Sequence, residues 1–389
     1  MAAYQIPSDV IFEILVCLPV KTLLRFKSVC KDWYTLINSS FFRQLHLSKS
    51  LVSNSWQNRA LFYAELDSLC VIDDVNCPLE PVKLYWPKYI IKDPYYLFTV
   101  GSCNGLVCLC LTEPGPTCFT KVWCFLICNP STRTFKCKPN APFFEKKKHL
   151  KFIDLSYGFG YDGEHDDYKI VITPRVWKES VRDDVYIYSC KDDLWKHATT
   201  PIPAQLLSET FRHRRTNIPF ANNMLHYRAS RNLGEFNGPN FVIARLDLSS
   251  ETWRDDLSFP VAVNSLTDVT FGVLDGCFYV RVVDRVADYS QNVWMMKSYG
   301  DEDSWSKKYS NIPGKFYRFV GPSKERSGRL LIMDCYLGAY NLIWYDPQDD
   351  TTEAFELKTN PRNSRVQLCI ASLVSIPGRS FNPRTTFIL

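Results

Sequence analysis

The N-terminal residues 6–33 have the sequence IPSDVIFEILVCLPVKTLLRFKSVCKDW. Ser8 is a favourable helix N-cap, and Asp9 places a negative charge in the first turn. The apolar residues that follow recur with the helical period, at Ile11, Ile14, Leu15 and Leu18. This spacing predicts a helix with one apolar face, and Pro19 ends it.

Two further short helices are expected after Pro19, over residues 21–29 and 30–37. The Ser39-Ser40 pair breaks the pattern, and residues 41–45 would add one more turn. A unit of about 40 residues buries too little surface to offset its own conformational entropy. Its apolar side must therefore be covered, either by the rest of the chain, as in an ordinary helical cap, or by a partner protein.

This stretch resembles the F-box over residues 5–45, with the spacing of that family throughout. The matching elements are Ile6-Pro7, Asp9, Ile14-Leu15, Leu18-Pro19-Val20-Lys21-Thr22-Leu23, Arg25, Val29-Cys30-Lys31, Trp33 and Leu36-Ile37. The one departure is Ile6, where leucine is commoner in the family. The resemblance implies docking on a Skp-family adaptor, which links such chains to a cullin–RING ubiquitin ligase.

Carried over position by position, the resemblance places the adaptor-binding surface on ten residues. They are Ile6, Pro7, Ile11, Leu15, Leu18, Pro19, Leu23, Val29, Cys30 and Trp33. A buried aromatic residue such as Trp33 is the usual kind of anchor in protein interfaces. Truncating Trp33 is expected to cost ~3–5 kcal/mol of folding or docking.

The composition is that of an ordered intracellular protein. Of the 389 residues, 46% are hydrophobic and 22% charged, so the chain can bury a core. No apolar run reaches the ~18 residues that span a bilayer. Asp9 and Glu13 interrupt the N-terminal apolar stretch, unlike a secretory signal peptide. We therefore expect no membrane partner and a cytoplasmic location, with the nucleus as an addition.

The fifteen cysteines are expected to stay reduced. No Cys-x-x-Cys pair occurs, although Cys124, Cys128 and Cys137 lie close in sequence, with His149 beyond them. Zinc would favour paired short spacings, so buried small hydrophobic side chains are the favoured interpretation and no metal site is predicted.

The net charge of +5 is spread thinly, apart from two basic clusters at residues 146–149 and 212–215. Both clusters lie in loop-like segments near prolines. Nucleic-acid binding would gather such residues on one face together with stacking aromatics. Solvated loop tips are the favoured interpretation, an acidic protein contact is the alternative, and no nucleic-acid partner is expected.

From residue 50 onward the sequence repeats a β-hairpin: a strand, a polar turn and a strand led by an aromatic residue. The aromatic residues fall 50–60 positions apart, at Phe135, Trp195, Trp253, Trp305 and Phe355. A second strand pair lies between successive hairpins, so each period holds four strands. This is typical of a propeller blade.

A weaker unit at residues 61–69 brings the expected number of blades to six. The last strand, residues 369–374, would return to the first blade and close the ring, which removes free sheet edges. An irregular two-sheet β domain is the alternative. The fold class is thus α plus all-β: a three-helix N-terminal unit over residues 1–48, followed by a six-bladed propeller over 49–389.

The repeating part resembles the Kelch-like F-box-associated domain of plant F-box proteins. The matching runs are GSCNGLV at 101–107, NPSTR at 129–133, GFGYD at 158–162, DYKIV at 167–171 and LDG at 274–276. Three of these runs also suit tight turns, at Asn104-Gly105, Asn129-Pro130 and Asp275-Gly276.

No catalytic residue and no cofactor are predicted. Gly158, Gly160 and Gly163 complete a G-x-G-x-x-G pattern, but inside a hairpin and not before a helix, so no helix dipole is available for a phosphate. The acidic residues Asp162, Glu164, Asp166 and Asp167 could bind calcium. A solvated turn is the favoured interpretation.

Two functions of different classes follow. The first is the substrate-recognition subunit of a Skp–cullin–F-box ubiquitin ligase, in which the propeller captures a protein for ubiquitin transfer without bond chemistry of its own. Substrate contacts would come from loops on one propeller face, with candidates at 139–152, 174–184, 204–218 and 228–240. The second is a propeller enzyme such as a glycan-acting hydrolase, which needs convergent carboxylates in the central funnel.

The resemblance also suggests classes of substrate. S-locus F-box proteins, which recognise pistil ribonucleases (S-RNases) in self-incompatibility, share the length and architecture. Family members that turn over immune receptors or other regulators fit equally well. The net charge of +5 counts mildly against a strongly basic ribonuclease as the target.

Overall fold

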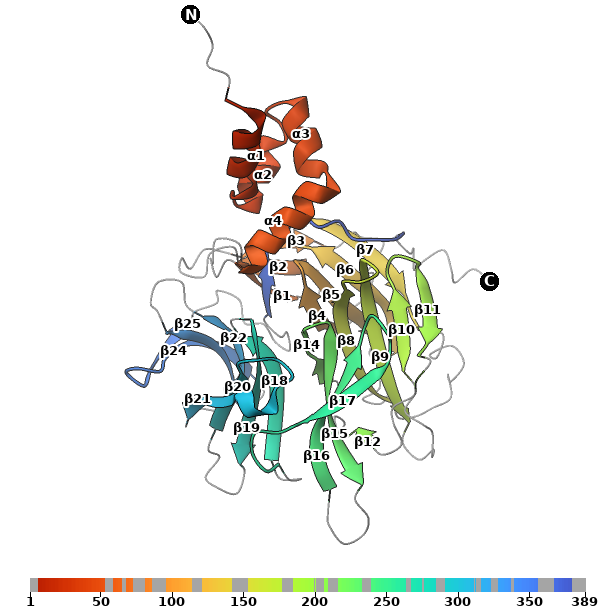
Figure 1. Ribbon diagram of the computed structural model, residues 1–389, viewed down its shortest axis with the longest axis vertical. Helices are drawn as coiled ribbons and strands as arrows, with labels where there is room; N and C mark the ends of the chain where they lie inside the picture. Colours follow the sequence, from red (N-terminus) through yellow and green to blue (C-terminus); the bar gives the residue numbers. More distant parts are fainter. Residues whose placement is uncertain are drawn as a thin grey trace, which may run out of the picture.

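The computed structural model describes residues 6–52, 59–64, 68–72, 81–85, 96–113, 121–141, 153–176, 185–198, 200, 206–208, 216–232, 239–263, 267–274, 276–284, 291–310, 312, 316–322, 328–336, 339–355 and 367–379. Within them, a helical unit at the N-terminus precedes a ring of β-sheets (Figure 1). None of the helices in this described part is long and apolar enough to cross a membrane.

The helical unit has four helices in the described residues: α1 (Ser8–Val16), α2 (Val20–Phe26), α3 (Lys31–Asn38) and α4 (Ser40–Val52). The predicted N-cap at Ser8 is wrong by one position, because Pro7 occupies it and α1 has no side-chain cap. Cys30 caps α3, and its Sγ accepts the N–H of Trp33 at 3.5 Å.

The fourth helix is longer than the single turn expected after Ser39-Ser40. Ser39 does interrupt the chain direction, but its hydroxyl then accepts the N–H of Phe42 at 3.2 Å and so caps α4. Phe42, His46 and Ser50 form the buried side of this 13-residue helix. α4 leads from the other helices down to the propeller (Figure 1).

The described strands form six sheets, as predicted for a six-bladed propeller. Blade 1 is β26 (Gln367–Ile370), β1 (Arg59–Ala64), β2 (Ser68–Ile72) and β3 (Val82–Tyr85). Blade 2 is β4 (Tyr96–Cys103), β5 (Leu106–Glu113), β6 (Lys121–Asn129) and β7 (Thr134–Pro139). Blade 3 is β8 (Ile153–Asp162), β9 (Asp167–Val176), β10 (Tyr186–Ser189) and β11 (Leu194–His197).

The other three blades follow in chain order. Blade 4 contains β12 (Leu206–Ser208), β14 (Phe220–Ala221), β15 (Met224–Asn232), β16 (Pro239–Asp247) and β17 (Trp253–Ser258). Blade 5 is β18 (Thr267–Leu274), β19 (Cys277–Asp284), β20 (Gln291–Met296) and β21 (Trp305–Ser310), with the 3-10 turn η3 (Glu302–Ser304) before β21. Blade 6 is β22 (Phe316–Pro322), β23 (Leu330–Tyr336), β24 (Ala339–Asp346) and β25 (Thr351–Phe355).

The ring closes through the end of the sequence. β26 pairs antiparallel with β1, with Leu61 opposite Leu368, so the predicted return of the last strand to the first blade is confirmed. The bounds differ from the predicted 369–374, because the strand begins at Gln367 and ends at Ile370. The weak repeat unit at residues 61–69 is the β1–β2 hairpin. It corresponds to the middle strands of the blade and not to the outer pair, because β26 supplies the innermost strand.

The five periodic aromatic residues all lie in the outermost strand of a blade, as the hairpin repeat predicts. They are Phe135 in β7, Trp195 in β11, Trp253 in β17, Trp305 in β21 and Phe355 in β25. The turn before them recurs as well. In blade 4 the Oδ1 of Asp247 accepts the N–H groups of Ser249 and Ser250, and Glu251 then adopts a positive φ of 55°. Asn129 and Arg133 repeat the arrangement in blade 2.

Blade 4 departs from the regular repeat. Two short strands, β12 and β14, share the inner edge of β15, and β13 (Thr216–Ile218) instead pairs parallel with β8 of blade 3. The inner strand of this blade is thus divided among three pieces. A four-strand period read from the sequence does not anticipate this division.

The core lies between neighbouring blades. Blades 2 and 3 enclose Phe125, Ile127, Phe159 and Ile170, all buried. Cys124, Cys128 and Cys137 lie in the core between blades 1 and 2, where burial raises the pKa of the Cys128 thiol. The twelve cysteines whose side chains the structure describes are free thiols. The described residues contain no cluster of metal-binding side chains, and His149 lies outside them.

After β26 the chain continues as a segment without regular structure, residues 371–379, here called the strap. It is the dark blue trace that crosses the propeller below α4 (Figure 1). Ser372, Leu373 and Ile376 of the strap are buried. The strap therefore belongs to the packed structure, although its sequence shows no repeat.

Candidate functional site

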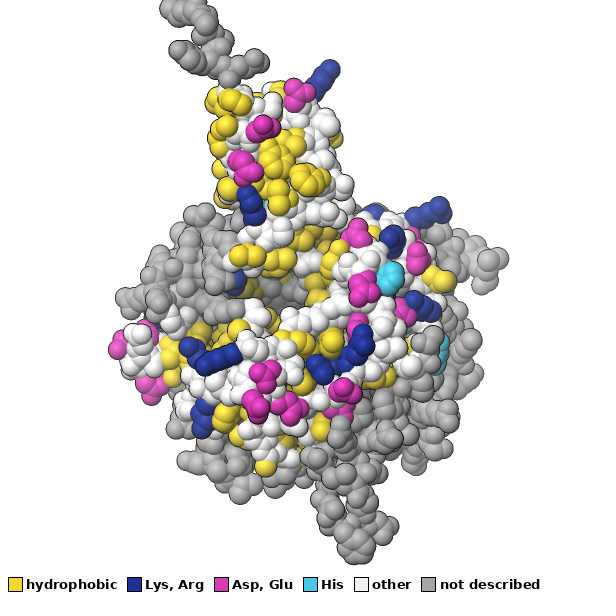
Figure 2. Space-filling view, in the orientation of Figure 1, with side chains coloured by type: hydrophobic (Ala, Val, Ile, Leu, Met, Phe, Trp, Pro, Cys, Tyr) yellow, Lys and Arg dark blue, Asp and Glu magenta, His cyan; other side chains and the backbone are white. Residues whose placement is uncertain are grey.

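The helical unit exposes large apolar side chains that its own fold leaves uncovered. Apart from Leu51 and Val52 at the end of α4, they are Ile6, Val10, Ile14, Val29, Tyr34 and Phe41, with exposed fractions of 47–66%; we call these six the exposed apolar set. Figure 2 shows hydrophobic side chains gathered on this unit. Val10 and Ile14 are four residues apart in α1 and share one side of it, and Ile6 lies just before the helix. Phe41 stacks on Phe12, with ring centroids 6.0 Å apart.

The structure divides the ten residues predicted to bind an adaptor into three groups. Ile6, Pro7, Val29 and Cys30 are exposed; Ile11, Leu18, Pro19 and Trp33 are partly buried; Leu15 and Leu23 are buried. In the free chain Leu15 and Leu23 pack with Ile37 and Phe42 in the core of the helical unit. They hold the helices together, and the exposed and half-buried residues are the ones available to a partner.

Four members of the exposed apolar set were absent from the predicted surface: Val10, Ile14, Tyr34 and Phe41. The four-residue spacing of Val10 and Ile14 within the predicted helix could have identified these two. Periodicity alone assigned Ile14 to the same face as Leu15, but α1 packs on α4 through Leu15 and Val16 and leaves Ile14 outside.

Trp33 lies at the base of this surface. Its ring is tilted on Phe26, with centroids 5.3 Å apart, and it is half-buried. The contact with Phe26 holds the ring of Trp33 in place, and the accessible part of the ring remains available to a partner. Many anchor residues of protein interfaces are held in this way.

His46 joins α4 to the end of α1. Its Nε2 lies 2.9 Å from the carbonyl oxygen of Leu18, and its ring stacks on Phe42. Burial lowers the pKa of His46. The neutral imidazole therefore serves the packing of the helical unit.

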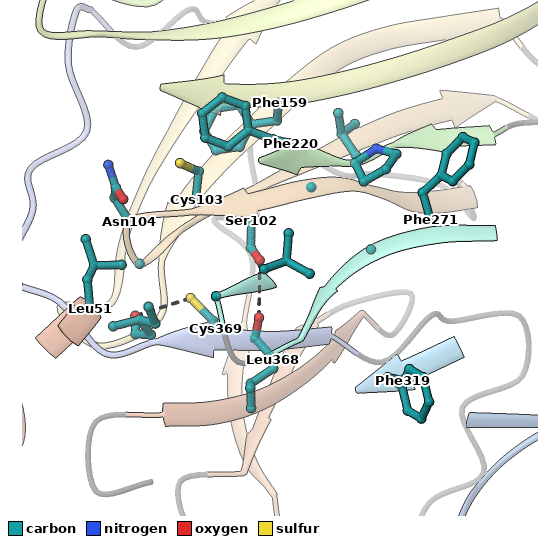
Figure 3. A pocket seen from close by; sticks show the side chains of 18 of the residues that line it. Leu51, Ser102, Cys103, Asn104, Phe159, Phe220, Phe271, Phe319, Leu368 and Cys369 are labelled. Carbon is teal, nitrogen blue, oxygen red and sulfur yellow. Dashed lines mark hydrogen bonds between the residues drawn. The ribbon is translucent and has the colours of Figure 1, made fainter. Parts of the chain in front are cut away.

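A cavity of about 380 Å³ lies at the centre of the propeller. Its wall comes from the innermost strands of all six blades, including Phe159 of β8, Phe220 of β14, Phe271 of β18 and Phe319 of β22 (Figure 3). Leu51, near the end of α4, lines the same cavity. The helical unit thus reaches the mouth of the central funnel.

The described part of the funnel wall lacks the chemistry that a glycosidase needs. Among its described lining residues the charged one is Arg59, and no Asp or Glu is among them. Glycoside hydrolysis needs a pair of carboxyl groups flanking the scissile bond. The described wall therefore lacks the groups that the enzyme hypothesis requires.

The acidic loop is a structural turn. The buried carboxylate of Asp162 accepts the N–H groups of Glu164 and His165 and pairs with Lys169 at 2.8 Å. Burial opposes ionisation, but the hydrogen bonds from Lys169 and His165 outweigh it, so the pKa of Asp162 lies below its ordinary value. Lys169 also reaches Glu251 of blade 4 at 2.8 Å. This ion pair joins two blades and leaves the Asp162 oxygens occupied.

One end of the propeller carries both the tight turns and the helical unit. Gly105, in the β4–β5 turn, lies against Ser372 of the strap, and Leu51 shares the cavity with Asn104 of that turn. The strands flanking the four candidate substrate segments run to the opposite end. Most of those segments, and both basic clusters, lie outside the described residues.

Two family models match the chain. The F-box domain matches residues 4–45, and the F-box associated beta propeller domain matches residues 70–353.

Individual plant proteins are similar over most of their length. The F-box protein CPR1 of Arabidopsis thaliana is 30% identical over 95% of this chain and 88% of its own length. The F-box protein At4g22390 is 30% identical over 90% and 86%, and the F-box/kelch-repeat protein At3g23880 is 27% identical over 85% and 85%, both also from Arabidopsis thaliana.

Proposed function

Because the chain belongs to the F-box proteins with an F-box-associated β-propeller domain, we propose that it is the substrate-recognition subunit of a Skp–cullin–F-box ubiquitin ligase. The observation that carries this proposal is the exposed apolar set. A small unit that leaves six large apolar side chains in water, beside a half-buried Trp33, has the composition of the buried part of an interface.

We place the adaptor contact on the exposed apolar set together with Pro7, Cys30 and Trp33. Ile11, Leu18 and Pro19 lie at its margin, and Leu15 and Leu23 support it from inside. Through the adaptor, a cullin–RING ligase would be recruited. The chain would supply no bond chemistry; it would raise the effective concentration of a bound protein near the conjugating enzyme.

The propeller would bind the protein substrate at the end opposite the helical unit. At the near end, tight turns, the strap and α4 already occupy the surface. The described strands that flank the segments at 139–152, 174–184, 204–218 and 228–240 run to the other end, and the short strands β12 and β13 lie within 204–218. Segments that connect strands of a rigid scaffold are the usual location of binding residues.

For the substrate itself we propose a regulated plant protein, with a non-self S-RNase as the specific candidate and an immune receptor or another regulator as the alternative. The support is the shared length and architecture. No nucleic acid and no membrane enter the proposal, and the place of action would be the cytoplasm, with the nucleus as an addition.

The adaptor proposal is tested by capture of a purified Skp-family adaptor on the intact chain. Ile14→Asp combined with Val29→Asp should abolish capture, because each puts a charge into the proposed apolar contact. Leu194→Asp is the matched control, since Leu194 is equally exposed but lies on β11 of the propeller. Retention of the adaptor by the double variant would contradict the proposal.

A further inference from the structure

The strap is held firmly on the propeller. The Nδ2 of Asn129 donates to the carbonyl oxygens of Ser372 and Val374, at 3.1 and 2.8 Å. The Oδ1 of the same side chain accepts the N–H groups of Ser131 and Thr132 in the β6–β7 turn. One buried amide therefore ties the strap to a hairpin of blade 2.

A second anchor lies further along the strap. The Nζ of Lys138, fully buried, donates to the carbonyl oxygens of Pro377 and Arg379, at 3.0 and 2.8 Å, and to Asp193 of blade 3 at 2.7 Å. Between the two anchors Ile376 enters the core of blades 2 and 3. The strap thus bridges two blades as it crosses them.

The opposite side of the strap belongs to the helical unit. Leu373, 3% exposed, is part of the cluster formed by Leu15, Leu23, Ile37 and Phe42, and Ala371 packs beside it. Arg43 of α4 donates to the hydroxyl of Ser375. Alternate parts of one extended segment therefore lie in two different cores, that of the helices and that of the blades.

From this geometry we propose that Leu373 and Asn129 are positioning residues, which hold the helical unit in one orientation on the propeller. The proposal rests on the ligase function given above. A substrate bound by the propeller must be presented at a fixed distance from the conjugating enzyme, and the strap supplies the rigid connection between the two halves.

The test measures the distance between the two halves directly in the full chain. Fluorophores are attached to genetically encoded reactive residues at two exposed positions, Lys31 in α3 and Asp255 in β17. Leu373→Ala removes the contact with the helical core. Asn129→Asp keeps the oxygen that accepts from the turn but replaces the donor that faces the strap.

Single-molecule energy transfer should show a distance distribution at least about twofold broader in both variants, and Leu373→Met should restore the narrow one. Leu257→Ala is the control, because Leu257 is a buried leucine of blade 4 away from the strap. Distributions as narrow as in the unaltered chain, or equal broadening by Leu257→Ala, would overturn the proposal.

A second readout separates this proposal from the ligase function. In a reconstituted ligase, Asn129→Asp should bind the adaptor as tightly as the unaltered chain, because Asn129 lies in blade 2 and not in the helical core, yet modify its own lysines at least about threefold more slowly. Unchanged rates would overturn the positioning role. Failure of the unaltered chain to bind the adaptor would overturn the ligase function, and the distance measurement would still decide the role of the strap.

Discussion

Replacing Lys169 by methionine tests how the blades are held together. The Nζ of Lys169 donates to Asp162 and Glu251, both at 2.8 Å, and to the carbonyl oxygen of Leu248 at 2.6 Å. Asp162 is fully buried and Glu251 nearly so. Methionine has a similar length but no charge, so both carboxylates would lose their common cation.

The expected loss of unfolding free energy depends on which partners each carboxylate retains. Removing one partner of a buried ion pair costs ~3–5 kcal/mol, because a charge is left uncompensated. Glu251 retains Lys196 at 2.7 Å, and Asp162 retains His165 at 2.8 Å. We therefore expect a value at the low end, about 3 kcal/mol of unfolding free energy.

Urea unfolding of the full chain, followed by tryptophan fluorescence and by circular dichroism, measures this difference. Lys196→Met is the control: Lys196 is about half-exposed, so its loss should cost at most ~1 kcal/mol. The Lys169 deficit should also shrink as the pH falls toward ~4, since protonation removes the unpaired charges. A deficit below ~1 kcal/mol at neutral pH would refute the assignment of Lys169 as a buried link between blades.

Three further predictions follow from the propeller. Burial lowers the pKa of His226 to about 3, so the folded chain resists protonation of this side chain. The free energy of unfolding should therefore fall by about 1.4 kcal/mol from pH 7.5 to 5.5 through this group. A His226→Gln variant whose unfolding free energy fell as steeply with pH would contradict this. Gly105→Ala should lower the midpoint of thermal unfolding more than Gly276→Ala. Both glycines have positive φ, but only at Gly105 would a Cβ clash with the Ser372 Oγ of the strap. Equal decreases would show that the strap can shift to accommodate the Cβ. Deleting residues 367–379 should abolish the sharp cooperative unfolding of the propeller, since β26 completes blade 1, and a transition as sharp as that of the full chain would disprove this closure.

The architecture was largely predictable from the sequence. The aromatic residues such as Trp195 and Trp253 follow a turn whose chemistry is local, an acceptor side chain and then a residue with positive φ. Local chemistry of this kind is visible in sequence, and its repetition gave the number of blades. The closing strand was predictable because an apolar run near the end of the sequence had no other sheet to join.

The candidate site was predictable only in part. Both Ile14 and Leu15 are apolar, and which of them faces water depends on how α1 packs against α4, a helix that appeared in the sequence as a single turn. The strap was predicted wrongly: residues 371–374 were expected to continue the last strand, and the anchoring of the segment was not foreseen. Its anchors come from far along the chain, since Asn129 and Lys138 show their role only when residues 372–379 lie beside them. Contacts between residues so far apart in the chain produce no periodic pattern in the sequence.

The pairing of β1 with β26 has a consequence for folding during synthesis on the ribosome. Leu61 pairs with Leu368, and at ~5–20 residues per second roughly 15 to 60 s of translation separates them. Throughout that interval the nascent chain exposes the apolar side chains of its N-terminal helices, and the edge of β1 that later pairs with β26 has no partner strand. Each newly made chain therefore exposes aggregation-prone surface during translation, and binding of a chaperone or of the proposed adaptor would cover it.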